Sequence, residues 1–405
     1  MNKAISKKII HIFHDDKFID GAIKLFEEVA PKISEYYVVK KKGIALQYVK
    51  SDQIIRIDLD DNNERETFLE SVNSEVNSVI FVHALDYTQQ KVVLRINKAI
   101  PKVWFIWGYD LYLTWPLLHK TLYLIKTKKL LGVKSNYKTN LLSSSVGFFL
   151  FKNHLLLKTF SKKTHVLLGE IFDTDFYKAA RMIDYVAPIV PTEMEIIKGM
   201  KLPAKYVPFE YVCLQDLLGD KINETVYGKP NIMVGNSADP SNNHVDVFEK
   251  LAKMDLKGRK IYVPLSYGGN DFYKKAVIEE GRRLFKDNFH PLTDFMPLEK
   301  YNEVLLSCGT LILNHVRQQA VGNIVVMGYL GAKIYLNNAS PVYKYYKQQG
   351  IVISSTNELA DNNFQQNLSS SNIALNKSRF YDLYSREAVH TKITVLVNKV
   401  LQQSF

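Results

Sequence analysis

The sequence predicts an α/β protein built from two doubly wound units, each a parallel sheet covered by helices on both faces. Short apolar runs alternate with amphipathic helical segments along most of the chain, which is the pattern of parallel sheets. Polar clusters follow many of these runs, as they do where ligands bind outside the carboxyl ends of strands. The length of 405 residues is enough for two domains, each with its own core.

The composition limits the class of protein and of partner. With 46% hydrophobic and 23% charged residues, and no repeat or low-complexity tract, the chain is typical of globular proteins. A formal net charge of +12 favours an anionic partner, such as nucleic acid, anionic lipid or a phosphorylated substrate. The cysteines, Cys213 and Cys308, lack metal-ligand spacing, so we expect a reducing compartment and no zinc site.

The hydrophobic pattern also bears on membrane insertion. The sequence contains no run of the ~18 apolar residues that a spanning helix needs, so we expect no segment to cross a bilayer. The N-terminus, MNKAISKKIIHIFHDD, has a basic start but few apolar residues before its acidic end. We interpret it as leading into a first strand rather than as a signal peptide.

The first unit begins with a predicted strand over Lys8–Phe13, followed by a polar turn that contains Asp16 and an amphipathic helix over Ile19–Ala30. Further short strands are predicted at Tyr36–Val39, Ile54–Ile57, Val79–Val82 and Val103–Ile106. Residues directly after such strands are the candidates for ligand binding, which here are Asp16, His83 and Asp110. Each of them can also be a helix cap or a satisfied loop residue.

No acidic residue occurs between Asp110 and Glu170. Lysines are interleaved with apolar residues in this interval, at Lys120, Lys126, Lys128, Lys129, Lys134, Lys138, Lys152, Lys158, Lys162 and Lys163. Mixed basic and apolar residues at helical spacing predict that Lys120–Lys163 rests on an anionic membrane surface. A solvated basic face over a core helix is the alternative. A nucleic-acid surface fits less well, because the aromatic residues cluster apart from the lysines.

The boundary between the units is predicted in the polar stretch Asp216–Lys229, where the alternation of strands and helices breaks. The last segment, Asn372–Leu401, is predicted to be helical and to pack back on the first domain. The predicted domains are therefore an N-terminal domain over 1–215, a C-terminal domain over 216–371 and a terminal helix within 372–405.

Two strands of the second unit are followed by loops rich in side-chain amides and hydroxyls. After Ile232–Val234 come Gly235, Asn236, Ser237, Asp239, Ser241 and Asn242, and after Ile261–Pro264 come Tyr267 and Asn270. Such residues cap helices in any protein, so their composition alone is a weak signal.

The stretch Leu311–Asn337 predicts a strand, a polar turn, a helix over Ile324–Leu330 and a second strand. The turn contains Arg317, Gln318, Gln319, Gly322 and Asn323. Free N–H groups at a helix start, backed by a guanidinium and two amides, suit a diphosphate. An ordinary turn with surface amides explains the same pattern.

Four blocks of this sequence resemble one known family. They are Phe105–Tyr112 (FIWGYDLY), Val234–Asn242 (VGNSADPSN), Pro291–Tyr301, and Arg317-Gln318-Gln319 followed by Gly322. In this order they resemble the lipid-linked 4-acetamido-4,6-dideoxygalactose (Fuc4NAc) transferases of glycosyltransferase family 56, which work in enterobacterial common antigen synthesis. The resemblance extends from about residue 8 to about residue 345. Asp16 and His83 fit the family pattern, whereas Ala238, Ala320 and Asn323 depart from it.

The resemblance implies a GT-B fold, in which two doubly wound Rossmann-like domains face a cleft. It implies a peripheral enzyme of the hexosyltransferase type on the cytoplasmic face of the bacterial inner membrane. The enzyme would move an amino deoxysugar from a dTDP-sugar to a polyprenyl-diphosphate-linked oligosaccharide. The donor would be bound by the second domain, through Gly235, Asn236, Ser237, Asp239, Ser241, Asn242, Tyr267, Asn270, Arg317, Gln318, Gln319, Gly322 and Asn323. These groups can hold a departing diphosphate without a metal, so no cofactor is expected.

The acceptor would be bound by the first domain, where Asp16, His83 and Asp110 are the catalytic candidates. Asp16 is the first choice for the base, because the first loop of such a sheet lies against the cleft. Retaining GT-B enzymes commonly carry two glutamates eight residues apart; Met327 occupies the region of the second here, so the stereochemistry stays open.

Two other functions are compatible with the sequence. One is a GT-B enzyme that uses another nucleotide sugar or a soluble acceptor, and the acid-free basic stretch argues against a soluble acceptor. The other is a non-catalytic nucleotide- or nucleic-acid-binding module. Polar clusters after strands occur in both predicted units, and they are more numerous than such a module needs.

Overall fold

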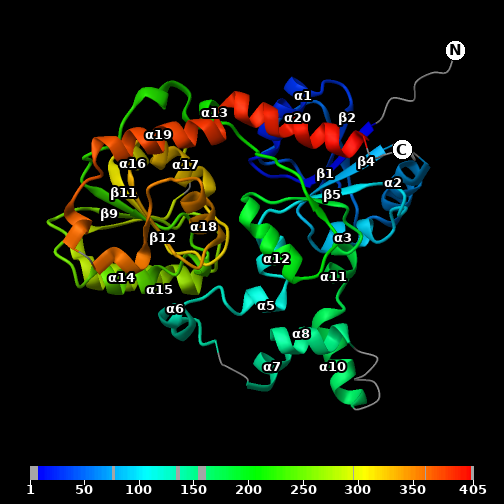
Figure 1. Cartoon of the computed structure of the whole chain (residues 1–405), viewed down its shortest axis with the longest axis horizontal. Helices are drawn as coiled ribbons and strands as arrows, with labels where there is room; N and C mark the ends of the chain where they lie inside the picture. Colours follow the sequence, from blue (N-terminus) through cyan, green and yellow to red (C-terminus); the bar gives the residue numbers. More distant parts are fainter. Residues whose placement is uncertain are drawn as a thin grey trace. The chain divides into compact units, whose positions relative to one another are not determined.

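The computed structural model describes residues 8–74, 78–133, 137–153, 161–294, 296–360 and 362–402. The chain divides into two compact units, each with its own parallel sheet and core (Figure 1). Unit 1 comprises the described parts of 1–119, 136–213 and 386–405, and unit 2 those of 120–135 and 214–385. Among residues singled out in the sequence, Lys134, Lys158, Phe295 and those of 1–7 lie outside the described ranges.

The sheet of unit 1 has seven parallel strands in the order β3-β2-β1-β4-β5-β6-β7. The strands are β1 (Lys8–His14), β2 (Ser34–Val39), β3 (Ile54–Ile57), β4 (Ser78–His83), β5 (Lys102–Phe105), β6 (Tyr185–Ala187) and β7 (Lys205–Tyr206). The chain moves outward from β1 through β2 to β3 and then returns to β4 on the other side of β1. Such a reversal of strand order opens the crevice in which doubly wound sheets bind ligands.

The helices of unit 1 cover this sheet, and several of them lie in a long helical insertion between β5 and β6. They are α1 (Ile19–Val29), α2 (Asn62–Ser74), α3 (Tyr87–Val93), α4 (Tyr109–Tyr112), α5 (Pro116–His119), α7 (Tyr137–Leu142), α8 (Ser145–Lys152), α10 (Lys162–Phe172), α11 (Asp175–Ala180), α12 (Met194–Gly199) and α20 (Arg386–Gln402). Helix α20 lies beside α1 (Figure 1), and its Ile393 and Leu396 are buried in the same core as Phe26 of α1. Lys392 of α20 also donates to the buried Glu210 carboxylate over 2.8 Å.

The sheet of unit 2 has six parallel strands in the order β10-β9-β8-β11-β12-β13, and its order reverses between β8 and β11. The strands are β8 (Asn231–Val234), β9 (Ile261–Pro264), β10 (Phe289–Leu292), β11 (Cys308–Leu313), β12 (Lys333–Leu336) and β13 (Ser354–Ser355). Its helices are α6 (Ile125–Leu130), α13 (Leu214–Leu218), α14 (His244–Leu251), α15 (Asp271–Phe285), α16 (Leu298–Leu306), α17 (Val321–Tyr329), α18 (Pro341–Gln348) and α19 (Ser370–Tyr384). Short 3-10 turns lie at Pro191–Glu193, Gly219–Asn223, Pro240–Asn242, Lys286–Asn288, Thr356–Ala360 and Asn362–Gln365.

The boundary predicted after residue 215 lies at Leu214, and the two units differ from the predicted domains in two longer segments. Residues 120–135, which were assigned to the N-terminal domain, belong to unit 2, because α6 packs on α14 and partly buried Leu130 and Leu131 contact the core of unit 2. The predicted terminal helix is two helices separated at Ser385, where the backbone is extended. Of these, α19 packs on α17 in unit 2, whereas α20 packs back on unit 1.

The described residues contain neither a membrane-spanning helix nor a cluster of metal-ligating side chains. No helix within them is both long and apolar enough to cross a membrane. The same residues hold no group of three or more histidine, cysteine or acidic side chains arranged to bind a metal ion.

Candidate functional site

The loop after β8 turns sharply at Gly235, which has a φ of +74°. A Cβ atom at this position would lie 2.5 Å from His244 Nε2 and 2.8 Å from Asn242 Oδ1, so only glycine fits. The turn lets the Asn236 N–H donate to Asn242 Oδ1 over 2.9 Å. The residues that follow Gly235 therefore fold back over the end of their own strand.

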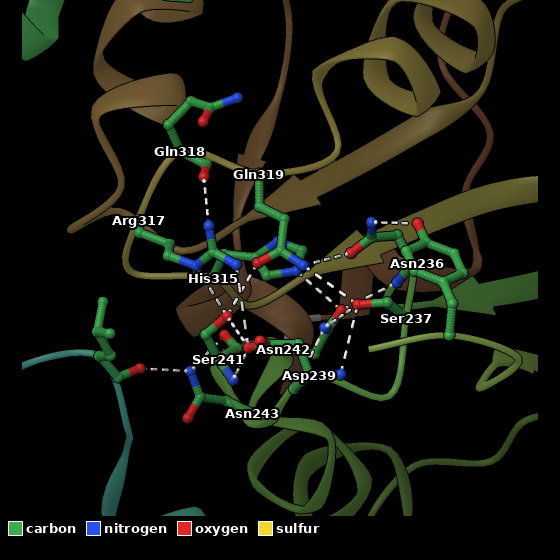
Figure 2. Close-up of polar contacts among 12 residues, drawn as sticks. Asn236, Ser237, Asp239, Ser241, Asn242, Asn243, His315, Arg317, Gln318 and Gln319 are labelled. Carbon is green, nitrogen blue, oxygen red and sulfur yellow. Dashed lines mark hydrogen bonds and ion pairs between the residues drawn. The ribbon is translucent and has the colours of Figure 1, made fainter. Parts of the chain in front are cut away.

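Hydrogen bonds within this loop fix its shape (Figure 2). Asp239 Oδ1 accepts from the backbone N–H of Ser241 over 2.8 Å and from its hydroxyl over 2.5 Å. Asn242 Nδ2 donates to Ser237 Oγ and to the Asp239 carbonyl. The polar side chains of the loop thus contribute to holding it in one conformation.

The loop after β11, Asn314–Ala320, is joined to the first loop by side-chain hydrogen bonds (Figure 2). The bonds run from His315 Nε2 to Asn242 Oδ1 (2.8 Å), from Arg317 Nε to Ser241 Oγ (3.0 Å), and from Gln319 Nε2 to Asn236 Oδ1 (2.9 Å). Gln319 Oε1 lies 2.9 Å from Ser241 Oγ and is the second acceptor within reach of the Ser241 hydroxyl. Both loops follow the strands between which the sheet order reverses, which is where doubly wound sheets bind their ligands.

Arg317 is the cation at this junction. Its guanidinium is buried, donates to Ser241 and to the Gln318 carbonyl, and lies 4.0 Å from Asp239 Oδ1. Burial holds the pKa of His315 well below its usual value, and the charge of Arg317 lowers it further. His315 is therefore neutral, and the positive charge of the site is concentrated on Arg317.

Helix α17 begins directly after this loop. Its N-cap residue, Ala320, has a left-handed φ of 60° and provides no side-chain cap, so the first N–H groups of the helix lack a capping acceptor from it. A Cβ atom added to Gly322 would meet only Leu217 Cδ2, at 4.0 Å, so there is room beside the first turn. Backbone donors next to a guanidinium form a site suited to an anionic group.

The remaining candidates of unit 2 divide into two groups. Tyr267 and Asn323 lie at the edges of the site, since the Tyr267 hydroxyl accepts from Asn236 Nδ2 and Asn323 Nδ2 donates to the Tyr301 hydroxyl. Asn270 instead caps α15, where its Oδ1 accepts from the Tyr273 N–H over 2.9 Å.

In unit 1 the structure places His83 inside the core. The Nε2 atom lies 3.0 Å from His11 Nδ1, and the Nδ1 atom lies 2.7 Å from the Tyr211 hydroxyl. The ring stacks on Phe105 at a centroid distance of 4.4 Å. Burial lowers the pKa of His83 to about 3, so the imidazole is neutral and belongs to a buried chain of hydrogen bonds.

Asp110 is also buried, and its carboxylate joins the ends of β4 and β5. It accepts from the backbone N–H groups of Leu85 and Trp107 and from the Trp104 indole. Gly108, with a φ of +91°, makes the turn that brings Asp110 back to these donors. Burial raises the pKa of Asp110 to about 6 despite these bonds. The block Phe105–Tyr112 therefore builds the end of the sheet.

Asp16 is the candidate that lies at the surface of unit 1. It is half-buried in the loop after β1, accepts from the Phe18 N–H over 3.2 Å, and has its pKa raised by burial. Aromatic side chains lie on its Phe18 side, since the Phe18 ring packs against Trp107 and the Trp107 ring packs against Tyr211. Burial is the main cause of the raised pKa of Tyr109 and of Tyr211, and the charge of Asp16 also raises both. We call Phe18, Trp107, Tyr109 and Tyr211 the aromatic patch.

Sequence reasoning did not single out an ion pair beside Asp16, between His14 and Asp86. His14 ends β1 and Asp86 caps α3 after β4, so the pair spans the reversal of the sheet. Burial opposes the charge on His14, but the hydrogen bond and charge of Asp86 raise its pKa above the ordinary value. His14 and Asp86 each follow an apolar run, and this was the signal for them in the sequence. Their pairing depends on the strand order, which the sequence does not show.

A family model matches most of the second half of the chain. Residues 205–385 match the family model described as 4-alpha-L-fucosyltransferase, glycosyl transferase group 56. The match contains both loops of the candidate site and the start of α17. It confirms the resemblance to family 56 over this part of the chain.

Comparison with known structures gives matches over nearly the whole chain. The N-terminal domain of trehalose-6-phosphate phosphatase from Candida albicans has a TM-score of 0.61 and 10% identity, with coverage of 100% of this chain and 98% of that one. Sucrose-phosphate synthase from Thermosynechococcus elongatus has a TM-score of 0.59 and 9% identity, with coverage of 98% and 99%. HepE from Anabaena in complex with UDP has a TM-score of 0.57 and 10% identity, with coverage of 97% and 100%. These similarities confirm the predicted GT-B fold.

Proposed function

We propose that this chain, a glycosyltransferase of the GT-B fold whose residues 205–385 match family 56, transfers an amino deoxysugar from a dTDP-sugar to a polyprenyl-diphosphate-linked oligosaccharide. The sugar would resemble Fuc4NAc, and the reaction would serve bacterial surface polysaccharide synthesis. The observation that carries the proposal is the pair of loops at the β8–β11 reversal, with Arg317 and the uncapped start of α17 beside them.

The chemistry of the leaving group supports a nucleoside diphosphate donor in unit 2. Negative charge develops on the diphosphate as its bond to the sugar breaks, and groups that stabilise this charge accelerate the reaction. Arg317 supplies a cation, and the first turn of α17 supplies backbone donors next to the open space at Gly322. Because these groups are part of the protein, we expect turnover without an added metal ion.

The surroundings of Asp16 support a role as the base in unit 1. The acceptor hydroxyl must lose its proton as its oxygen bonds to the sugar carbon, and a nearby carboxylate can take that proton. Asp16 is half-buried beside the aromatic patch, and its raised pKa makes it a stronger base than an exposed aspartate. Flat aromatic side chains with a few polar groups also form the usual lining of ligand sites.

The helical insertion between β5 and β6 supports a lipid-linked acceptor. Helices α7, α8 and α10 pack together in unit 1 and expose apolar side chains that we call the apolar surface: Tyr137, Leu141, Val146, Phe149 and Val166. Lys138, Lys152, Lys162 and Lys163 are exposed on the same helices. Exposed apolar groups among lysines, in an interval without acidic residues, suit insertion between anionic lipid headgroups. We propose peripheral attachment to the cytoplasmic face of the inner membrane through this surface.

Only part of the predicted membrane-facing stretch, Lys120–Lys163, belongs to these helices of unit 1. Lys120, Lys126, Lys128 and Lys129 belong to unit 2, and the Lys126 ammonium lies 3.3 Å from the Glu249 carboxylate of α14. The proposal therefore concerns the described part of 137–166, and it leaves the lysines of unit 2 out of the membrane surface.

A turnover screen tests the proposed function. The full chain is incubated with dTDP- and UDP-linked sugars and a polyprenyl-diphosphate oligosaccharide, and release of the nucleoside diphosphate is measured with and without a chelator. We expect release from a dTDP-linked amino deoxysugar that depends on the lipid-linked acceptor and is unchanged by the chelator. Equal rates with a soluble acceptor would contradict the lipid-linked acceptor, and release from UDP-sugars alone would contradict the dTDP donor.

A further inference from the structure

Residues Leu122–Leu131, which we call the clasp, belong to unit 2 although the chain on both sides of 120–135 belongs to unit 1. Asn243, which follows the first site loop, attaches the clasp through its side chain. Its Nδ2 donates to the Leu122 carbonyl over 3.1 Å (Figure 2). The same nitrogen lies 2.9 Å from the Ser241 carbonyl oxygen and 3.1 Å from that of Asn314, and Oδ1 accepts from the Leu124 N–H over 2.8 Å. One amide thus connects the clasp to both loops of the donor site.

A second anchor fixes the rest of the clasp. The Asp246 carboxylate of α14 accepts from the N–H groups of Lys126 and Thr127 and from the Thr127 hydroxyl, at 2.9, 3.0 and 2.7 Å. Thr127 and Leu122 are buried, and Leu130 packs against the core of unit 2. The clasp is therefore attached to unit 2 by both hydrogen bonds and apolar packing.

Tyr123 lies between the two backbone groups of the clasp that bond to Asn243. Its side chain is half-buried. Asn243 also donates to the carbonyl of Ser241, and the Ser241 hydroxyl bonds both Arg317 and Asp239, so the backbone of Tyr123 is held next to these two charges. Burial raises the pKa of the phenol, and the charge of Asp239 raises it further, so Tyr123 keeps its proton at neutral pH. A protonated hydroxyl beside the cation of the site can act as a donor towards an anion bound there.

We propose that Tyr123 is a donor-binding residue whose phenol O–H donates a hydrogen bond to the diphosphate of the sugar nucleotide. This inference rests on the proposed function. It places in the donor site a residue from the first half of the sequence, outside the segment that matches family 56. The clasp then carries one residue of the donor site, Tyr123, and Asn243 and Asp246 hold this segment in position.

Calorimetry on the full chain tests this role with Tyr123→Phe, which removes only the hydroxyl. We expect about tenfold weaker binding of dTDP or UDP, whichever the wild-type chain binds, because one hydrogen bond to a charged group is lost. Binding of the matching nucleoside, measured by competition, should not change, since it carries no diphosphate. The matched control is Ile125→Ala, which alters an 82% exposed side chain of the same clasp and should leave both affinities unchanged.

Two further variants separate the possible failures. Arg317→Ala is the reference for loss of diphosphate binding: if it weakens binding and Tyr123→Phe does not, the inference is wrong and the proposed function stands. If the wild-type chain binds neither nucleotide, both are wrong. Asp246→Ala should raise hydrogen exchange in residues 122–128 and weaken nucleotide binding in parallel; faster exchange with unchanged affinity would contradict a role for the clasp in the donor site.

Discussion

At the scale of single residues, Asp15 and Asp16 are neighbours in opposite electrostatic situations. The Asp15 carboxylate accepts from the backbone N–H groups of 47–49 and from the Lys40 ammonium. Burial opposes its charge, but these bonds together outweigh burial and lower its pKa to about 2. Asp16 accepts from the Phe18 N–H, and burial raises its pKa. Asp15 thus anchors the loop after β2, whereas Asp16 is the carboxylate better suited to take up a proton.

The first prediction concerns Asp16→Asn. This change removes the proposed base while keeping the shape of the side chain, so turnover should fall by about 10²-fold or more with unchanged affinity for dTDP. Steady-state rates and calorimetry measure the two quantities. Normal turnover of Asp16→Asn together with loss in Asp86→Asn would move the base to the His14–Asp86 pair.

The second prediction concerns Arg317→Ala. Its guanidinium is proposed to bond the donor diphosphate, so its loss should weaken dTDP binding by about 1.5–3 kcal/mol. Because Arg317 also donates to Ser241 Oγ, thermal unfolding must show that the loop region still folds. Unchanged dTDP affinity in a folded variant would remove Arg317 from the site.

At the scale of elements, α8 is apolar on both of its faces. It buries Phe148 against Trp115, Phe172 and Tyr177, which explains how the helix is attached to unit 1. The opposite side exposes Val146 by 60% and Phe149 by 66%. Apolar groups on the outer side of a helix are unfavourable in water and become favourable when another apolar phase covers them.

The third prediction follows from this outer side of α8. Binding of the chain to vesicles should rise with anionic lipid content and fall with added salt, and Phe149→Ser should weaken it about tenfold or more through lost apolar burial. Co-sedimentation measures the bound fraction. Phe272→Ser on α15 is the matched control, since Phe272 is 60% exposed in unit 2 and lies outside the apolar surface. Equal binding to neutral and anionic vesicles would contradict the proposal.

Elements with a strong local signal could be predicted from the sequence. The first strand was expected over Lys8–Phe13 and is observed over Lys8–His14, because its short apolar run is rich in β-branched and aromatic residues, which favour strands. Helix α17 was expected from Ile324 but begins at Val321, because Ala320 takes a left-handed conformation that its residue type disfavours. The clasp could not be assigned to unit 2, since helical spacing does not show which core a helix joins.

For the candidate sites too, the sequence showed local position but not the packing partners. Arg317, Gln319 and Ser241 were predicted to lie together, and they do, because the residues after neighbouring parallel strands meet at one edge of the sheet. His83 occupies an equivalent sequence position in unit 1 but points into the core, towards His11 and Tyr211. Position after a strand predicts the edge of the sheet, whereas the direction of the side chain depends on packing partners far away in the sequence.

At the scale of the whole molecule, each unit contains buried histidines with lowered pKa values. Burial lowers the pKa of His83 in unit 1 and His244 in unit 2 to about 3, and it holds His11 and His315 well below the usual range. An unfolded histidine takes up a proton below a pH of about 6.5. Between this pH and the folded pKa, the unfolded chain therefore binds more protons than the native chain.

The last prediction is that both units lose stability as the pH falls below about 6.5. Each neutral buried histidine contributes stability that is fully present above this pH and declines by up to about 1.4 kcal/mol per pH unit below it. Burial raises the pKa of Asp110, and the carboxyl gains stability on acidification and offsets part of the loss in unit 1. Calorimetric scans from pH 7.5 to pH 5 should show every unfolding transition moving to lower temperature, with the smaller shift in unit 1. Transitions that stay fixed over this range would show that the histidines are not held neutral, and would contradict the buried hydrogen-bond chain through His83.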